Sequence, residues 1–198
     1  MWTGIVQSAM ILGGILAFYG MDFGLMVRYD KQRRSQGSGR SWEYTLMAMI
    51  GVTILVLQPI VVPELGLHLT AGWGRGIQIA GLVLLVGALL LHGWARRHLQ
   101  HFYAERVELQ ESHRLVDSGP YAYVRHPIFV SFYLFVVGLL LINPSLPTLL
   151  VAGYVFWDFS RAARQEEALL SQNLVGYAEY MARTPRFLPR LGRSSRGE

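Results

Sequence analysis

Residues 127–160, PIFVSFYLFVVGLLLINPSLPTLLVAGYVFWDFS, decide the fold that the sequence predicts. Two apolar runs, 127–142 and 146–160, flank the segment Asn143-Pro144-Ser145-Leu146-Pro147, whose two prolines make a sharp helix break. We therefore expect a hairpin of two helices. A bilayer core about 30 Å thick needs roughly 20 apolar residues in a helix. Both runs are shorter than that, so we expect these helices to continue into polar surroundings.

Three further apolar runs, at 3–21, 44–62 and 76–95, each have the length of a membrane span. Of the 198 residues, 52% are hydrophobic and only 16% are charged. Soluble domains usually carry about 25% charged residues. No clear cleavage site follows the first run, so we expect it to be retained as a helix. We predict an all-α integral membrane protein with about five transmembrane helices.

Connections rich in basic residues alternate along the chain with connections that have almost none, and this alternation tests the number of predicted spans. Segments 28–43 and 96–126 hold five each and the part from Arg161 holds seven, whereas Arg75 alone lies in the other connections. Positive residues favour the cytoplasmic side, so the N-terminus is expected outside and the C-terminus in the cytoplasm. The formal net charge is +5, but the basic residues cluster at the ends of apolar runs, so we predict no nucleic-acid partner.

These patterns divide the chain into three parts. Residues 1–95 would hold three transmembrane helices. Residues 96–190 would hold an interfacial helix, a loop, the hairpin and C-terminal helices, and 191–198 a disordered tail. The chain has no cysteine, which excludes disulfides, thiolate zinc sites and cysteine nucleophiles.

A loop rich in chemically useful groups precedes the hairpin: Leu115-Val116-Asp117-Ser118-Gly119-Pro120-Tyr121-Ala122-Tyr123-Val124-Arg125-His126-Pro127. Gly-Pro forces a turn, and Pro127 pushes His126 toward an extended conformation. Such a loop can hold a small polar ligand with an aromatic part, such as a nucleoside. The alternative is an interfacial anchor, because tyrosine and arginine are favoured at membrane interfaces.

A second polar stretch, Arg161-Ala162-Ala163-Arg164-Gln165-Glu166-Glu167, follows the fifth span. Adjacent carboxylates point about 100° apart on a helix, so Glu166 and Glu167 cannot serve one small site equally. The alternative is a solvated helix end with surface ion pairs. Asp158 weakens that alternative, because a carboxylate inside the membrane boundary is costly unless it is paired or functional.

Two weaker signals lead to no site. His98 and His101, with Glu105 further on, would share a helix face suited to a metal, but interfacial histidines are more often plain polar residues, and we predict no metal. The glycine-rich segment 72–76 follows no strand and falls on the outer side of the predicted topology, so we interpret it as a flexible turn.

The chain resembles the isoprenylcysteine carboxyl methyltransferase family, part of a wider group that includes phospholipid N-methyltransferases. The resemblance covers about residues 92–190 and rests on four motifs: Leu115-Val116-x-x-Gly119-Pro120-Tyr121-x-x-Val124-Arg125-His126-Pro127, Arg161-x4-Glu166-Glu167, Tyr177-x2-Tyr180 and Thr184-x-Arg186-x2-Pro189. It implies that 96–190 is a catalytic half, in a multi-pass protein expected in a bacterial inner membrane.

The resemblance also implies a cofactor, S-adenosylmethionine, held without a Rossmann domain between the loop before the fourth span and the C-terminal helices. Backbone and shape contacts to the nucleoside would come from Leu115, Val116 and Gly119. The pocket would be lined by Tyr121, Arg125 and His126, with Glu166 accepting hydrogen bonds. Phe129 stands where many relatives have tyrosine, and Ser131 where glycine is common. We expect one lost hydroxyl and looser packing of the fourth span.

Methyl transfer from a sulfonium is an in-line displacement, for which a protein mainly supplies alignment and a dry site. A carboxylate acceptor needs a cation to orient it, and Arg161 or Arg164 can provide one. An amine acceptor would instead need a proton removed, and Glu167 is the nearest base. We therefore take Arg161, Arg164 and Glu167 as candidate catalytic residues.

The leading hypothesis is O-methylation of a carboxylate on a lipophilic or isoprenoid-bearing acceptor at the cytoplasmic interface, with S-adenosylhomocysteine as product. The acceptor's tail would stay among the membrane lipids. One alternative is N-methylation of a phospholipid or small amine. Another is a non-catalytic carrier or sensor of the same fold. The sequence does not predict the oligomeric state.

Overall fold

The computed structural model describes residues 1–29, 42–67, 71–99 and 115–189. These residues form five long helices and one short one, listed in chain order: α1 (Gly4–Tyr29), α2 (Trp42–Val61), α3 (Ala71–Leu99), α4 (Pro127–Ile142), α5 (Leu146–Asn173) and α6 (Tyr177–Arg183). Two 3₁₀ turns, η2 (Pro63–Leu65) and η4 (Gly119–Ala122), join them. No strand occurs within the described ranges beyond one isolated bridge, so the all-α prediction is confirmed there.

Each predicted apolar run is helical, and α4 has the predicted bounds. Helix α5 continues beyond residue 160 into polar residues, as expected for the hairpin. Helices α1 and α3 are longer than the predicted runs. Helix α3 begins at Ala71, so the interpretation of the glycine-rich segment 72–76 as a flexible turn is wrong. Within the described ranges, Gly4–Arg28 and Gly72–Leu99 are long and apolar enough to cross a membrane, whereas Leu46–Val61 and Pro127–Ile142 are apolar but shorter. Five crossings and their orientation therefore stay predictions. The basic loop at 30–41, the interfacial helix over 100–114 and the tail from 190 lie outside the described residues.

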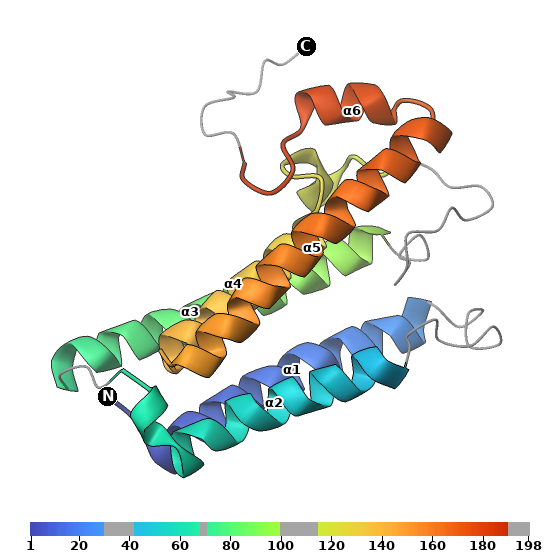
Figure 1. Cartoon of the computed structure of the whole chain (residues 1–198). Coiled ribbons are helices and arrows are strands. Elements are labelled where there is room, and N and C mark those ends of the chain that lie inside the picture. Colours follow the sequence, from blue (N-terminus) through green and yellow to red (C-terminus); the bar gives the residue numbers. More distant parts are fainter. Residues whose placement is uncertain (30–41, 68–70, 100–114, 190–198) are drawn as a thin grey trace.

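The helices pack as two groups (Figure 1). Helices α3, α4 and α5 lie side by side, and α1 and α2 form a pair against them. The α4–α5 turn lies at the same end of the molecule as the start of α1, and η4 and α6 lie at the other end. This arrangement brings the loop before α4, the end of α5 and α6 together.

Helices α3 and α4 form the closest pair in the described structure. A Cβ atom on Gly81 would lie 2.7 Å from the Gly138 carbonyl oxygen, and one on Gly138 would lie 2.9 Å from the Gly81 carbonyl oxygen. Small residues let helix backbones approach in this way where lipid offers no hydrophobic drive for association. The contact fixes the position of α4, whose first residue follows the predicted ligand loop.

Buried amides hold the α4–α5 turn. Asn143 donates to Gln58 of α2 at 2.6 Å, and Gln7 of α1 donates to Asn143 at 3.2 Å and to the Ile142 carbonyl at 2.8 Å. Gln78 of α3 donates to the same carbonyl at 3.0 Å. Buried polar groups are costly unless they are hydrogen-bonded, so this network favours one register of the helices.

Polar side chains also join α1 to α3. His92 Nε2 lies 2.9 Å from Asp22 Oδ1, and Arg96 Nε lies 3.2 Å from the same oxygen. The other ring nitrogen of His92 contacts the Ser131 hydroxyl at 2.9 Å, and Ser131 donates to the Ile128 carbonyl at 2.6 Å. Ser131 is fully buried, and its hydroxyl links α4 to α3.

We predict that Gly81→Ala lowers the free energy of unfolding in detergent by about 1–3 kcal/mol, because the added methyl group overpacks the α3–α4 contact. Gly87→Ala in the same helix is the matched control, since a Cβ there meets nothing within 4 Å. The control should be neutral or stabilising by up to about 1 kcal/mol, the ordinary preference of helices for alanine. Equal thermal shifts for both variants would contradict the close packing.

Candidate functional site

The buried carboxylate of Glu167 is the centre of the polar end of the molecule. Its Oε1 atom accepts from Arg125 Nε at 2.9 Å and lies 3.0 Å from His126 Nε2. Arg186 Nε donates to both carboxylate oxygens at 3.0 and 3.1 Å, and its Nη2 forms a second close contact with Oε2. One carboxylate of α5 thus binds three basic side chains from two other segments.

Backbone hydrogen bonds to residues 185 and 186 hold Arg125 and His126 beside Glu167. Their N–H groups donate to the carbonyls of Pro185 and Arg186, at 2.9 and 3.2 Å. Residues 184–189, which we call the strap, therefore run along the loop. Arg125 Nη1 also donates to the Met181 and Thr184 carbonyls at 2.8 and 2.7 Å, which satisfies carbonyl groups at the end of α6.

The start of the loop needs Gly119. Its φ of +59° is a conformation that side chains rarely adopt, and a Cβ atom there would collide with the His98 imidazole. Leu115 packs against buried Leu170, Tyr177 and Tyr180, and Val116 packs against the cluster around Tyr121. The Tyr180 hydroxyl donates to the Tyr121 carbonyl at 2.7 Å. These contacts hold the predicted cofactor residues of the loop against α6.

Charge and burial act in opposite directions on the pKa values here. Burial would raise the pKa of Glu167, but hydrogen bonds from His126 and Arg186 and the charge of Arg125 outweigh it, so this pKa lies far below its ordinary value. Burial would lower the pKa of His126, but hydrogen bonds to Glu166 and Glu167 raise it overall. The hydrogen bond to Glu167 likewise raises the pKa of Arg186.

The two adjacent glutamates contact different nitrogens of one histidine. Glu166 Oε2 lies 3.5 Å from His126 Nδ1, and Glu167 Oε1 lies 3.0 Å from Nε2. The Glu166 side chain is 38% exposed and that of Glu167 is 7% exposed. Glu167 is therefore occupied by protein cations, whereas Glu166 still offers oxygen atoms to a ligand.

The two predicted catalytic arginines lie outside this cluster. Arg161 and Arg164 are exposed on α5, and the Arg161 guanidinium lies over the Trp157 ring at 5.8 Å from its centre. Arg186 is the residue that the candidate set omitted. Its signal was present, because it belongs to the Thr184-x-Arg186-x2-Pro189 motif of the family resemblance.

Aromatic rings separate the cluster from the helix core. His126 stacks on Phe129 with ring centres 5.3 Å apart, and Phe129 stacks on Phe159 at 5.1 Å. Phe129, the departure from the family pattern, thus packs against His126. Phe187 of the strap lies 5.9 Å from His126 and 5.2 Å from Tyr133, measured between ring centres.

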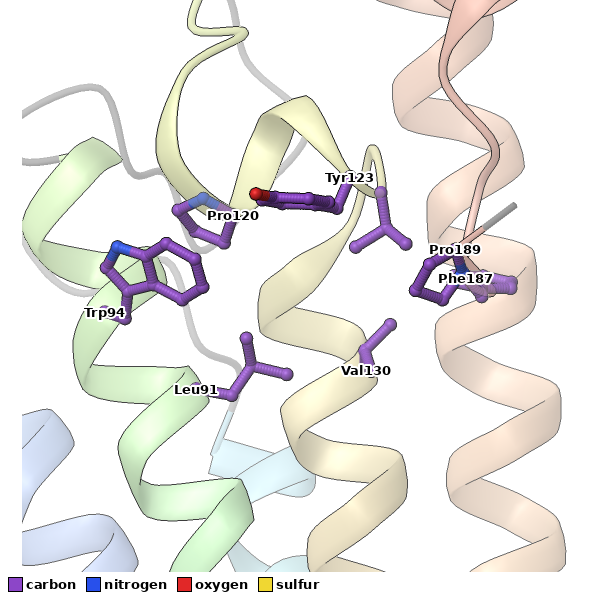
Figure 2. Close-up of a pocket in the computed structure, with 8 residues that line it drawn as sticks. Leu91, Trp94, Pro120, Tyr123, Val130, Phe187 and Pro189 are labelled. Atoms are coloured by element: carbon purple, nitrogen blue, oxygen red, sulfur yellow. The ribbon is translucent and has the colours of Figure 1, made fainter. Parts of the chain in front are cut away.

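A cavity of about 360 Å³ adjoins this site between α3, the loop and the strap (Figure 2). Its walls are almost wholly apolar and consist of Leu91, Trp94, Pro120, Tyr123, Val124, Val130, Phe187 and Pro189. Phe187 therefore belongs both to this cavity and to the aromatic surroundings of His126. An apolar cavity of this kind suits hydrocarbon better than a nucleoside.

The fold matches a solved structure described as the eukaryotic intramembrane Ras methyltransferase ICMT, isoprenylcysteine carboxyl methyltransferase. The TM-score is 0.66 at 23% sequence identity, over 93% of this chain and 68% of that one. The class of fold is therefore that of an all-helical intramembrane protein.

Sequence comparison defines the family more closely. Residues 79–172 match the model of the isoprenylcysteine carboxyl methyltransferase (ICMT) family. Protein-S-isoprenylcysteine O-methyltransferase B of Arabidopsis thaliana is 26% identical over 94% of this chain and 95% of its own length. The nickel-cobalt-cadmium resistance protein NccN of Alcaligenes xylosoxydans xylosoxydans is 35% identical over 41% of this chain. These comparisons support a protein similar to the ICMT family.

The lengths of the relatives differ. The matched stretch covers 39% of the NccN protein and 52% of the methyltransferase of Mus musculus, so the chain spans about two fifths to half of these curated relatives. The matched family region includes α4, most of α5 and the complete loop motif, but it ends before the strap that carries Arg186.

We predict that Glu167→Gln is strongly destabilising, by about 3 kcal/mol, because it leaves basic groups at a buried position without their counter-charge. Glu166→Gln is the matched control one residue away and should cost less than about 1 kcal/mol, since that carboxylate is partly solvated. Thermal unfolding of both variants measures the difference. Similar losses for the two would show that Glu167 does not organise this end of the molecule.

A second prediction concerns pH. The folded-state pKa of His126 is raised, so its charged form contributes stability that is full below the ordinary value of 6.5 and is lost as the pH rises through the raised value. The unfolding midpoint of the wild type should approach that of His126→Gln as the pH rises above 6.5. A constant gap between the two proteins over that range would contradict the raised pKa.

Proposed function

We propose that this protein is an integral membrane methyltransferase that uses S-adenosylmethionine to methylate the carboxylate of an isoprenylcysteine-type, lipid-tailed acceptor, with S-adenosylhomocysteine as product. The observation that carries the proposal is the buried cluster of Arg125, His126 and Glu167, formed from the motifs by which the chain resembles its family. The site would face the cytoplasm, with the N-terminus outside and the acceptor's tail among the lipids of a bacterial inner membrane.

The residues present fit this cofactor. S-adenosylmethionine carries an ammonium group, a sulfonium and ribose hydroxyls, which need acceptor oxygens, and Glu166 keeps such oxygens partly exposed. Gly119 and Tyr121 lie in the tight η4 turn, and with Leu115 and Val116 they would shape the nucleoside site. When bound, the cofactor supplies a methyl group that is already activated.

The chain's own groups would then mainly bind and orient. Glu167 would act as a positioning residue that holds Arg125, His126 and the strap, because a carboxylate with a strongly lowered pKa is a weak base. Arg161 and Arg164 are exposed on α5 and would be free to approach an acceptor carboxylate. The apolar cavity beside Phe187 would exclude water and receive part of a hydrocarbon tail.

N-methylation of an amine is the second candidate, and it is less well supported. It needs a base that removes a proton before or during transfer. The lowered pKa of Glu167 disfavours that residue as the base, which leaves the partly exposed Glu166. A carboxylate acceptor needs no such step, so the site favours O-methylation.

Binding of S-adenosylmethionine and S-adenosylhomocysteine by the detergent-purified protein tests the cofactor directly. Calorimetry should show saturable binding to the wild type and at least tenfold weaker binding to Glu166→Gln, the loss expected for a hydrogen bond to a charged group. Glu179→Gln, on the exposed side of α6, is the control and should bind like the wild type. A folded wild type that binds neither compound would favour the non-catalytic carrier.

The acceptor is tested by transfer of labelled methyl to an N-acetyl-S-isoprenylcysteine and, in parallel, to phosphatidylethanolamine. Carboxyl methyl esters are labile in base and methylamines are not. Base-labile label on the isoprenylcysteine compound is the expected result. Base-stable label on the amine lipid would replace O-methylation with N-methylation.

A further inference from the structure

A second polar contact joins α4 to α5, beneath the His126–Glu167 contact. The Tyr133 hydroxyl lies 3.2 Å from the Ser160 hydroxyl. Tyr133 follows His126 by seven residues, and Ser160 precedes Glu167 by seven. Because the hairpin is antiparallel, the Tyr133–Ser160 pair and the His126–Glu167 pair lie along the same α4–α5 interface. Seven residues are about two helical turns, which puts the hydroxyl pair about 10 Å further along the hairpin.

The surroundings of this pair are aromatic. Tyr133 is 8% exposed and stacks on Phe156 with ring centres 4.3 Å apart, while Phe187 packs edge-on against it at 5.2 Å. Phe187 also lines the apolar cavity. Phe187 therefore links the apolar cavity to the surroundings of the hydroxyl pair.

The two hydroxyls leave one hydrogen for a ligand. Each carries one O–H hydrogen, and their mutual hydrogen bond uses one of the two, whichever residue donates it. Among the residues that the structure describes, no further hydrogen bond of Tyr133 or Ser160 is found. Interhelical hydrogen bonds of this kind also hold membrane helices together, but that role accounts only for the mutual bond.

A cationic side chain lies near the pair on α5. Arg164 is exposed and follows Ser160 by one helical turn, so its long side chain is able to turn toward the two hydroxyls. A donor hydroxyl within reach of a guanidinium is a suitable arrangement for a carboxylate.

We propose that Tyr133 and Ser160, assisted by Arg164, bind the carboxylate of the acceptor and select it over uncharged analogues. This inference rests on the proposed function, because it names the residues that recognise the acceptor's head. The binding of that head would replace water around a partly buried polar pair with a charge-assisted hydrogen bond. Loss of such a bond weakens binding by about ten- to a hundredfold.

The experiment measures binding rather than turnover. An N-acetyl-S-isoprenylcysteine carboxylate and its carboxamide are titrated into the detergent-purified protein in the presence of S-adenosylhomocysteine, for the wild type, Tyr133→Phe and Ser160→Ala. The wild type should prefer the carboxylate by about tenfold or more, and both variants should lose that preference. Their affinity for S-adenosylhomocysteine should stay that of the wild type.

Both matched control variants lie in α5. Tyr154→Phe removes a hydroxyl from an exposed tyrosine of α5, and Ser171→Ala removes one from an exposed serine, so both should keep the preference. Equal weakening of carboxylate and carboxamide would mean a merely structural role, and an unchanged preference in Tyr133→Phe and Ser160→Ala would overturn the inference.

The measurements distinguish a failure of the proposed methyltransferase activity from a failure of the proposed carboxylate site. If the wild type transfers no methyl group but still prefers the carboxylate through these hydroxyls, the carboxylate site stands and the enzymatic activity does not. If the wild type is active on the carboxylate and the variants keep both their preference and their KM, the activity stands and this site is wrong.

Discussion

The bond network of one buried carboxylate, Glu167, connects three segments at the polar end of this protein: the loop before α4, helix α5 and the strap. The carboxylate joins α5 to the loop before α4 through Arg125 and His126, and to the strap through Arg186. A buried ion is expensive unless its hydrogen-bonding capacity is filled, and here it is filled from several directions. The loop, α5 and the strap are therefore fixed relative to one another by a single group.

This network requires the α4–α5 hairpin to have one register. His126 and Glu167 meet only if the turn at Asn143 is held, because a slip by one residue rotates each side chain by about 100°. The buried amides of Gln7, Gln58 and Gln78 hold that turn at one end of the molecule, and the close approach of Gly81 to Gly138 fixes α4 against α3. The N-terminal helices thus support the geometry of the Glu167 cluster from the opposite end of the hairpin.

The sequence predicted the helices well, because long apolar runs and the prolines at 144 and 147 are local signals. It missed contacts between residues remote in sequence. Asp22 falls just beyond the predicted first span, and nothing local marks its pairing with His92 and Arg96. The motifs singled out Arg125 and His126, which the structure brings together at Glu167, and the sequence assigned different roles to Glu166 and Glu167 without predicting which of the two is buried. That distinction depends on burial, which only the packing of α5 against the strap decides.

The strap contacts both the charged cluster and the apolar cavity, so a ligand with a polar head and an apolar tail would meet two parts of the same segment. Its carbonyls accept from the backbone of Arg125 and His126, its Arg186 binds Glu167, and its Phe187 is a wall of the apolar cavity. A single non-helical segment thus contributes both to the charged cluster and to the apolar wall of the cavity. Because the same backbone hydrogen bonds hold both, a movement of the strap would change the charged cluster and the cavity at once. Phe187 is the residue common to both regions, because it lines the cavity and its ring centre lies 5.9 Å from that of His126.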